Sequence, residues 1–122
     1  MTTPDERMRA LRFGRETLSE LIDRTDMPPR IRTGAAEVLQ RYPTHDDLVA
    51  LLETESLVLP SAWADAFKDT RSLLQEVGRM RNLRVGMPFC ILAILRHFPE
   101  AWLLDFVSRG PVLMPWLAQE RD

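Results

Sequence analysis

Apolar residues recur at every third or fourth position along most of the chain, which is the spacing of helices that bury one face. No segment alternates between apolar and polar residues for long enough to form a strand. The pattern predicts helices over residues of about 4–24, 29–42, 45–52, 62–78, 85–98 and 100–109. We therefore expect an all-α fold of about six helices, in a single helical domain that spans residues 1–122.

Prolines and capping residues mark where these helices begin and end. The start of the chain is typical of a helix N-terminus, because Thr3 can cap the first turn and Glu6 can complete a capping box. Pro43 and Pro99 each follow an aromatic residue and should separate one helix from the next. Beyond the sixth helix, residues 114–119 are expected to form one last turn.

The most apolar stretch is residues 85–99, which predicts a short helix buried on most of its surface. Cys90 in this stretch is expected in the core, because cysteine is among the residue types most often buried. In the next helix the apolar inner side is expected to consist of Trp102, Leu103, Phe106 and Val107.

A shift of 56 positions aligns the two halves of the chain without gaps. Identical residues then meet at Ala10 and Ala66, Arg15 and Arg71, Leu18 and Leu74, Glu20 and Glu76, Leu39 and Leu95, Pro43 and Pro99, and Leu48 and Leu104. Helical periodicity alone creates some matches, but the two aromatic-proline corners favour a true repeat. We therefore expect two tandem helix–corner–helix units, at approximately 8–52 and 64–108, packed into one compact domain.

The two units differ in their second helix. This helix is rich in arginine in the first unit, whereas its counterpart at residues 85–99 is apolar. We expect the apolar counterpart to be central in the fold or covered by a partner.

Composition narrows the functional classes. The chain has 28% charged and 45% hydrophobic residues and a net charge of −2, which is typical of a soluble globular protein. The charge lacks the positive bias of a dedicated nucleic-acid binder. A single cysteine suits a reducing compartment, no secretory signal pattern is present, and the longest apolar run is too short to span a bilayer. We expect a cytoplasmic location.

The first 48 residues resemble a group of short, uncharacterised bacterial proteins. The resemblance lies in Met1-Thr2-Thr3-Pro4-Asp5-Glu6-Arg7, Ala10-Leu11, Arg15-Glu16-x-Leu18 and Leu39-x-Arg41-Tyr42-Pro43. It covers about 40% of the chain and implies a bacterial origin and the helix–corner architecture. It implies no activity, because no function is established for that group.

Residues able to carry out catalysis are few. Cys90 and His97 lie about 10 Å apart along one helix, too far for direct proton transfer. Asp46 and Asp47 stand in a helix first turn, where acidic residues are favoured on electrostatic grounds alone. The chain also lacks a Gly-rich phosphate loop and the common metal-binding motifs. We therefore expect no enzyme activity, no metal site and no cofactor.

Binding to another protein, or to a second copy of the chain as a homodimer, is the expected function. Tryptophan is enriched at the energetic centres of protein interfaces, and the chain contains 3 of them. The apolar segment after the sixth helix must fold back onto the domain or cover a neighbouring subunit. The interaction candidates are Trp63, Trp102, Met114, Trp116 and Leu117.

A DNA-binding regulator is the alternative function. Helix–corner–helix units occur in DNA-binding proteins, and the helix around Arg30–Arg41 has an arginine-rich side. The net charge and Glu37 in the middle of that helix oppose this interpretation. The candidate contact residues are Arg30, Arg32, Thr33 and Arg41, with Arg79, Arg81 and Arg84 as a second basic group.

Overall fold

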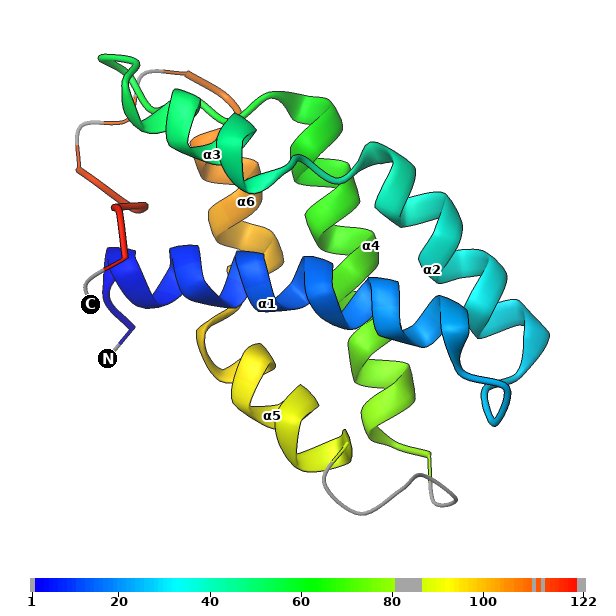
Figure 1. The fold of residues 1–122 in the computed structure, drawn as a ribbon. Coiled ribbons are helices and arrows are strands. Elements are labelled where there is room, and N and C mark those ends of the chain that lie inside the picture. Colours follow the sequence, from blue (N-terminus) through cyan, green and yellow to red (C-terminus); the bar gives the residue numbers. More distant parts are fainter. Residues whose placement is uncertain (1, 81–86, 111, 113, 121–122) are drawn as a thin grey trace.

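The computed structural model describes residues 2–80, 87–110, 112 and 114–120 (Figure 1). Its helices are α1 (Pro4–Asp23), α2 (Pro29–Arg41), α3 (His45–Leu52), α4 (Ser61–Gly78), α5 (Met87–His97) and α6 (Ala101–Val107). No strand occurs among the described residues. The predicted all-α class is confirmed, and the helix boundaries fall within a few residues of the predicted ones.

Two long helices, α1 and α4, organise the packing. Each of them packs against both α2 and α5, and α6 packs against α4 (Figure 1). The buried apolar side chains of these helices form one continuous core. The remaining helix, α3, adds Leu48 and Leu51 to that core.

The helix starts follow from local chemistry. The side chains of Thr3 and Thr44 each accept a hydrogen bond from the backbone N–H three residues ahead, and the carboxylates of Glu6 and Asp47 accept one from the backbone N–H of the capping threonine. These bonds lower the pKa of Glu6 and of Asp47, chiefly because the backbone N–H of the capping threonine binds the charged carboxylate. Both capping boxes use only neighbouring residues, so they can form wherever the rest of the chain packs.

Two aromatic corners meet at the centre of the core. Tyr42 follows α2 and Phe98 follows α5. Both rings contact Phe67 of α4 edge-on, with ring centroids 5.0 Å and 6.2 Å away. Burial raises the pKa of Tyr42 well above its ordinary value, so its hydroxyl stays protonated and donates a hydrogen bond to Leu11 O.

Each corner is also held by an arginine from a long helix. Arg15 donates from Nη1 to Tyr42 O at 2.9 Å, and Arg71 donates from Nη1 to Phe98 O at 2.9 Å. Carbonyls at the end of a helix have no donor within the helix. The two arginines supply that donor and so fix the direction in which the chain turns into α3 and α6.

Helix α5 corrects the prediction of a helix buried on most of its surface. Ile91 and Ile94 are buried, but Cys90, Leu92 and Ala93 are exposed, and 62% of Leu92 is accessible. The helix lies at the edge of the fold, with α1 and α4 on one side of it. An edge position leaves the opposite side open, so Cys90 is a surface thiol and not a core residue. That a partner covers this side stays a prediction.

Gly14 of α1 lies directly against the side chains of both corners. A Cβ atom at this position would lie 2.9 Å from Phe98 Cε2 and 3.0 Å from the Tyr42 hydroxyl oxygen. Alanine normally stabilises a helix by about 0.5–1 kcal/mol relative to glycine. Here the overpacking of buried rings costs about 1–3 kcal/mol, so we expect Gly14→Ala to lower the free energy of unfolding in urea.

Gly34 of α2 is the matched control, because it is also a helical glycine. A Cβ atom there would meet Leu73 Cδ1 at 3.7 Å, an ordinary contact. We expect Gly34→Ala to raise the free energy of unfolding by about 0.5–1 kcal/mol. Equal changes in the free energy of unfolding for both variants would contradict the close packing of Gly14 against Phe98 and Tyr42.

Candidate protein-interaction surface on helix α6

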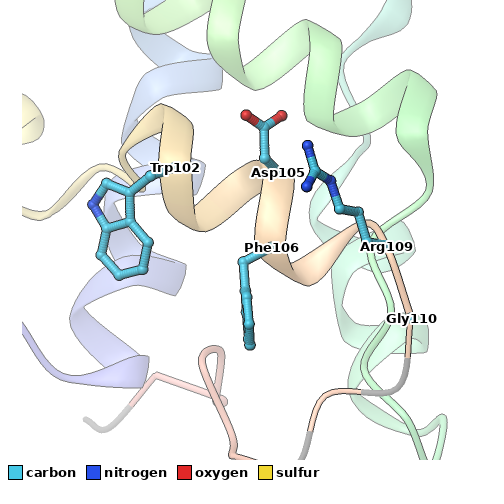
Figure 2. Close-up of a pocket in the computed structure, with 5 residues that line it drawn as sticks. All are labelled: Trp102, Asp105, Phe106, Arg109 and Gly110. Atoms are coloured by element: carbon cyan, nitrogen blue, oxygen red, sulfur yellow. The ribbon is translucent and has the colours of Figure 1, made fainter.

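Helix α6 carries two large aromatic side chains on its outer face. Trp102 and Phe106 are each 64% exposed. They are four residues apart, so both rings lie on the same side of the helix (Figure 2). Leu104 and Val107, on the other side, are buried. The prediction that Trp102 and Phe106 lie on the inner side of this helix was therefore wrong. The buried residues of that side are Leu104 and Val107.

The aromatic rings border a shallow hollow of about 550 Å³. Its lining residues, which we call the α6 surface, are Trp102, Asp105, Phe106, Arg109 and Gly110 (Figure 2). Exposed aromatic rings beside an acidic and a basic side chain are typical of a protein interface.

The charges of the α6 surface are held by neighbouring groups. Asp105 forms an ion pair with Lys68 of α4. The hydrogen bond from Lys68, and to a smaller extent the charge of Arg109, lowers the pKa of Asp105. Asp105 is therefore ionised at neutral pH, and Arg109 carries the opposite charge just beyond the end of the helix.

The indole ring of Trp102 is held in position by a hydrogen bond to Glu100. Its Nε1–H donates to Glu100 Oε2 at 2.8 Å. A bonded indole ring loses less conformational freedom on binding than a free one, so the contact preorganises the ring.

The other predicted interaction residues are divided between surface and core. Met114 is 78% exposed, and Trp63 is half-buried and packs against the core. Trp116 and Leu117 are only 3% and 2% exposed, so the structure removes them from the surface candidates. The reason is that the segment after α6 folds back onto its own domain. It also forms no last helical turn in the part that the structure describes.

Trp116 is the anchor of this C-terminal segment. Its Nε1–H donates to Leu57 O at 3.0 Å, and its own carbonyl accepts a hydrogen bond from Arg7 Nη1 at 3.1 Å. Further along, Ala118 N donates to Pro4 O at 3.3 Å. Residues 116–118 thus lie beside the start of α1 (Figure 1).

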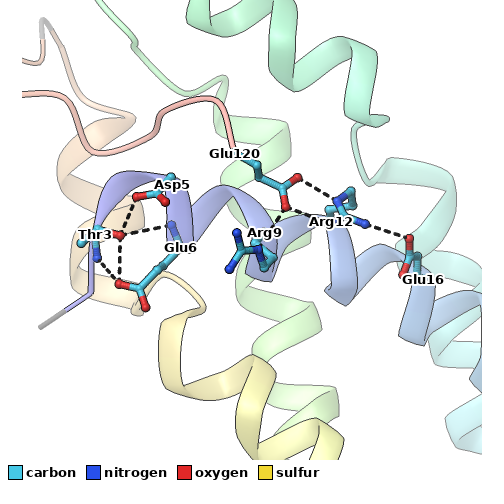
Figure 3. A network of polar contacts seen from close by, with 7 residues as sticks. All are labelled: Thr3, Asp5, Glu6, Arg9, Arg12, Glu16 and Glu120. Carbon is cyan, nitrogen blue, oxygen red and sulfur yellow. Dashed lines mark hydrogen bonds and ion pairs between the residues drawn. The ribbon is translucent and has the colours of Figure 1, made fainter. Parts of the chain in front are cut away.

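Glu120, the last residue of this segment that the structure describes, binds to α1 through its side chain. Its carboxylate accepts hydrogen bonds from Arg12 Nε at 2.8 Å and from Arg9 Nε at 3.3 Å (Figure 3). The hydrogen bond from Arg12 is the main cause of a lowered pKa for Glu120. Arg12 also pairs with Glu16 at 3.5 Å, on the exposed side of the same helix.

We expect Glu120→Gln to lower the free energy of unfolding by about 1 kcal/mol at neutral pH. A carboxylate with a lowered pKa in the folded state stabilises the protein above its unfolded pKa of about 4.3. That contribution is lost as the pH falls through the lowered folded pKa, so the difference between wild type and variant should shrink below the unfolded pKa and vanish once Glu120 is protonated in both states. Urea unfolding at several pH values measures it. Glu16→Gln is the control and should change stability by less than about 0.5 kcal/mol.

The arginines of α2 proposed for nucleic-acid contact are partly neutralised by α4. Arg30 forms an ion pair with Glu76, and Arg41 Nη2 lies 2.8 Å from Asp69 Oδ2. Paired acids reduce the positive potential that a phosphate backbone would meet.

The remaining nucleic-acid candidates are not gathered into one surface by the described contacts. Arg32 Nε donates to Ile22 O at 3.1 Å, and so satisfies a carbonyl at the end of α1. Thr33 and Arg79 are exposed. Two candidates, Arg81 and Arg84, lie outside the described residues.

Two of the side chains considered for catalysis, His97 and Asp47, form contacts that stabilise the fold. His97 contacts Thr2 Oγ1 at 3.1 Å through Nδ1 and Glu6 Oε2 at 3.2 Å through Nε2, which ties the end of α5 to the N-terminal segment. Asp47 belongs to the capping box of α3. Across the described part of the chain, no group of three or more His, Cys, Asp or Glu residues is placed to hold a metal ion.

Comparison with known proteins gives no further guide to function. Neither a protein-family model, nor a curated protein, nor a solved structure matches this chain. Among the described residues, no helix combines the length and the apolar character that a bilayer crossing requires.

The sequence analysis did not identify Asp105, Phe106 and Arg109 as members of the candidate interaction surface. A signal was present, because α6 reads Ala-Trp-Leu-Leu-Asp-Phe-Val and is apolar around nearly its whole circumference. A helix of that kind needs a cover on every side. At the edge of a small domain one side stays open, and that side is the α6 surface.

Proposed function

We propose that this chain is a non-enzymatic protein-interaction module that binds its partner through the α6 surface. One observation carries the proposal: Trp102 and Phe106 stand side by side on a folded helix and are each 64% exposed. Scattered exposed apolar residues are normal on a protein surface, whereas paired aromatic rings around a hollow are typical of binding sites.

The magnitude of the contact supports this function. A fully covered aromatic side chain buries about 150–250 Å², so the exposed parts of the two rings offer roughly 200–300 Å². At about 25 cal/mol per Å² this area contributes roughly 5–8 kcal/mol before the costs of association. A binding surface of this kind supports moderate affinity and needs further contacts for a tight complex.

We also propose that the domain arose from two tandem helix–corner–helix units. The support is a pair of equivalent contacts at the predicted offset of 56. Arg15 binds the carbonyl of Tyr42, and Arg71 binds the carbonyl of Phe98 in the same way. In addition, α1 packs against α2 as α4 packs against α5, and α2 packs against α4 as α5 packs against α1.

Affinity capture with matched variants tests the interaction function. Tagged wild-type protein and the double variant Trp102→Ala/Phe106→Ala are incubated with lysate of the native host, and captured proteins are identified by mass spectrometry. We expect a partner that the double variant retains at least about tenfold less. Leu92→Ala, which removes an equally exposed side chain from α5, should retain it. The same proteins on all three baits would contradict the proposal.

A further inference from the structure

We propose that the α6 surface binds a second copy of this chain, in a twofold dimer with the two α6 helices antiparallel. This inference rests on the proposed function and names its partner. A twofold interface brings one patch against the same patch, so the patch must be complementary to itself. The α6 surface meets that condition in both its charges and its aromatic rings.

The charges of Asp105 and Arg109 are complementary to the same two charges of a second copy. Asp105 lies in the last turn of α6, Arg109 lies two residues beyond the end of the helix at Val107, and their side chains point to the same side (Figure 2). Arg109 N donates to Phe106 O at 3.4 Å, so the turn that follows α6 keeps Arg109 close to the end of the helix. When two such sides run antiparallel, Asp105 faces Arg109 of the second copy, and Arg109 faces Asp105 of the second copy. A parallel arrangement would set like charges against each other.

The aromatic rings fit the same twofold axis. Midway between Asp105 and Arg109 lies residue 107, so the axis passes one residue from Phe106. A twofold rotation keeps each edge of the helix against the same edge of the other copy. The Phe106 rings of the two copies therefore meet beside the axis, each Trp102 covers the outer part of the contact, and the charged side chains pair alongside.

The area predicts a weak dimer. The exposed parts of the four rings together amount to about 400–600 Å², below the about 1,200–2,000 Å² of stable interfaces. The small net charge of −2 adds little repulsion between copies. We expect a dissociation constant between about 10 μM and 1 mM, so that monomer and dimer exchange rapidly.

Sedimentation velocity on the purified full chain, from about 10 μM to about 1 mM, tests the dimer. The average mass should rise toward twice the monomer mass. Trp102→Ala and Arg109→Asp should each raise the dissociation constant at least about tenfold. Leu92→Ala should leave it unchanged. Circular dichroism confirms that each variant is folded before its mass is interpreted.

A charge exchange tests the orientation of the two copies. Asp105→Arg and Arg109→Asp should each be monomeric alone, because like charges then face each other. An equal mixture should associate, because two arginines of one copy then face two aspartates of the other. If Asp105→Arg does not fold without its Lys68 partner, Trp102→Ala and Arg109→Asp still decide whether the α6 surface forms the dimer.

Three results would overturn the dimer: a monomer at every concentration, a dimer unaffected by Trp102→Ala and Arg109→Asp, or dissociation by Leu92→Ala in their place. The last result would locate the contact on α5. A monomer whose captured partner is still lost in the double variant leaves the proposed function intact and rejects only the second copy as the partner.

Discussion

Replacing Trp116 by alanine is expected to lower the free energy of unfolding by about 3–5 kcal/mol, as for other buried aromatic residues. The substitution leaves a cavity where a fully packed indole was. It also removes the donor of Leu57 O. Leu57 has a φ of 50°, a left-handed backbone that is strained for a residue with a side chain, and the bond from Trp116 helps to hold it there.

Urea unfolding followed by circular dichroism measures this effect. Met114→Ala is the matched control, because Met114 lies two residues earlier and is 78% exposed. We expect that variant to change stability by less than about 0.5 kcal/mol. A loss below about 1 kcal/mol for Trp116→Ala would mean that the C-terminal segment is not part of the core.

Replacing Phe67 by alanine is expected to cost about 3–5 kcal/mol as well, for a different reason. Phe67 is fully buried and its ring is the common contact of Tyr42 and Phe98. Its removal opens a cavity between the two corners and separates the halves of the core that α1 and α4 hold together. The stability of both corners should therefore fall together, in one cooperative transition.

Phe67→Leu separates the loss of volume from the loss of the ring. In the proposed repeat, Leu11 occupies the position 56 residues before Phe67, which makes leucine the matching residue to test. We expect this variant to be destabilised by roughly 1–2 kcal/mol, less than the alanine variant. Equal losses for both variants, measured by urea unfolding, would show that the aromatic contacts and not the filled volume stabilise this site.

Helix boundaries were predictable because their causes are local. The capping boxes of Thr3 and Thr44 and the corners at Pro43 and Pro99 depend on residues only a few positions apart. Helical periodicity is likewise a property of short windows. The all-α class, the order of the helices and their approximate ends could therefore be predicted from the sequence without knowledge of the packing.

The exposed apolar residues of the candidate interaction surface were predictable only in part. Trp102 and Met114 were expected at an interface and are exposed, but Trp116 and Leu117 were expected there and are buried. Composition and periodicity identify large apolar side chains that need a cover. They do not say whether that cover is the same chain or a partner, because this depends on contacts between distant segments.

The ends of the helices follow from the sequence alone, because capping and periodicity act between neighbours along the chain. In contrast, the bond from Trp116 to Leu57 O, the outward position of Trp102 and the edge position of α5 depend on the tertiary packing. Burial depends on which distant surfaces meet, and a small domain has too little interior for all of its apolar sides. The sides left uncovered, foremost the α6 surface, are where this protein is expected to bind.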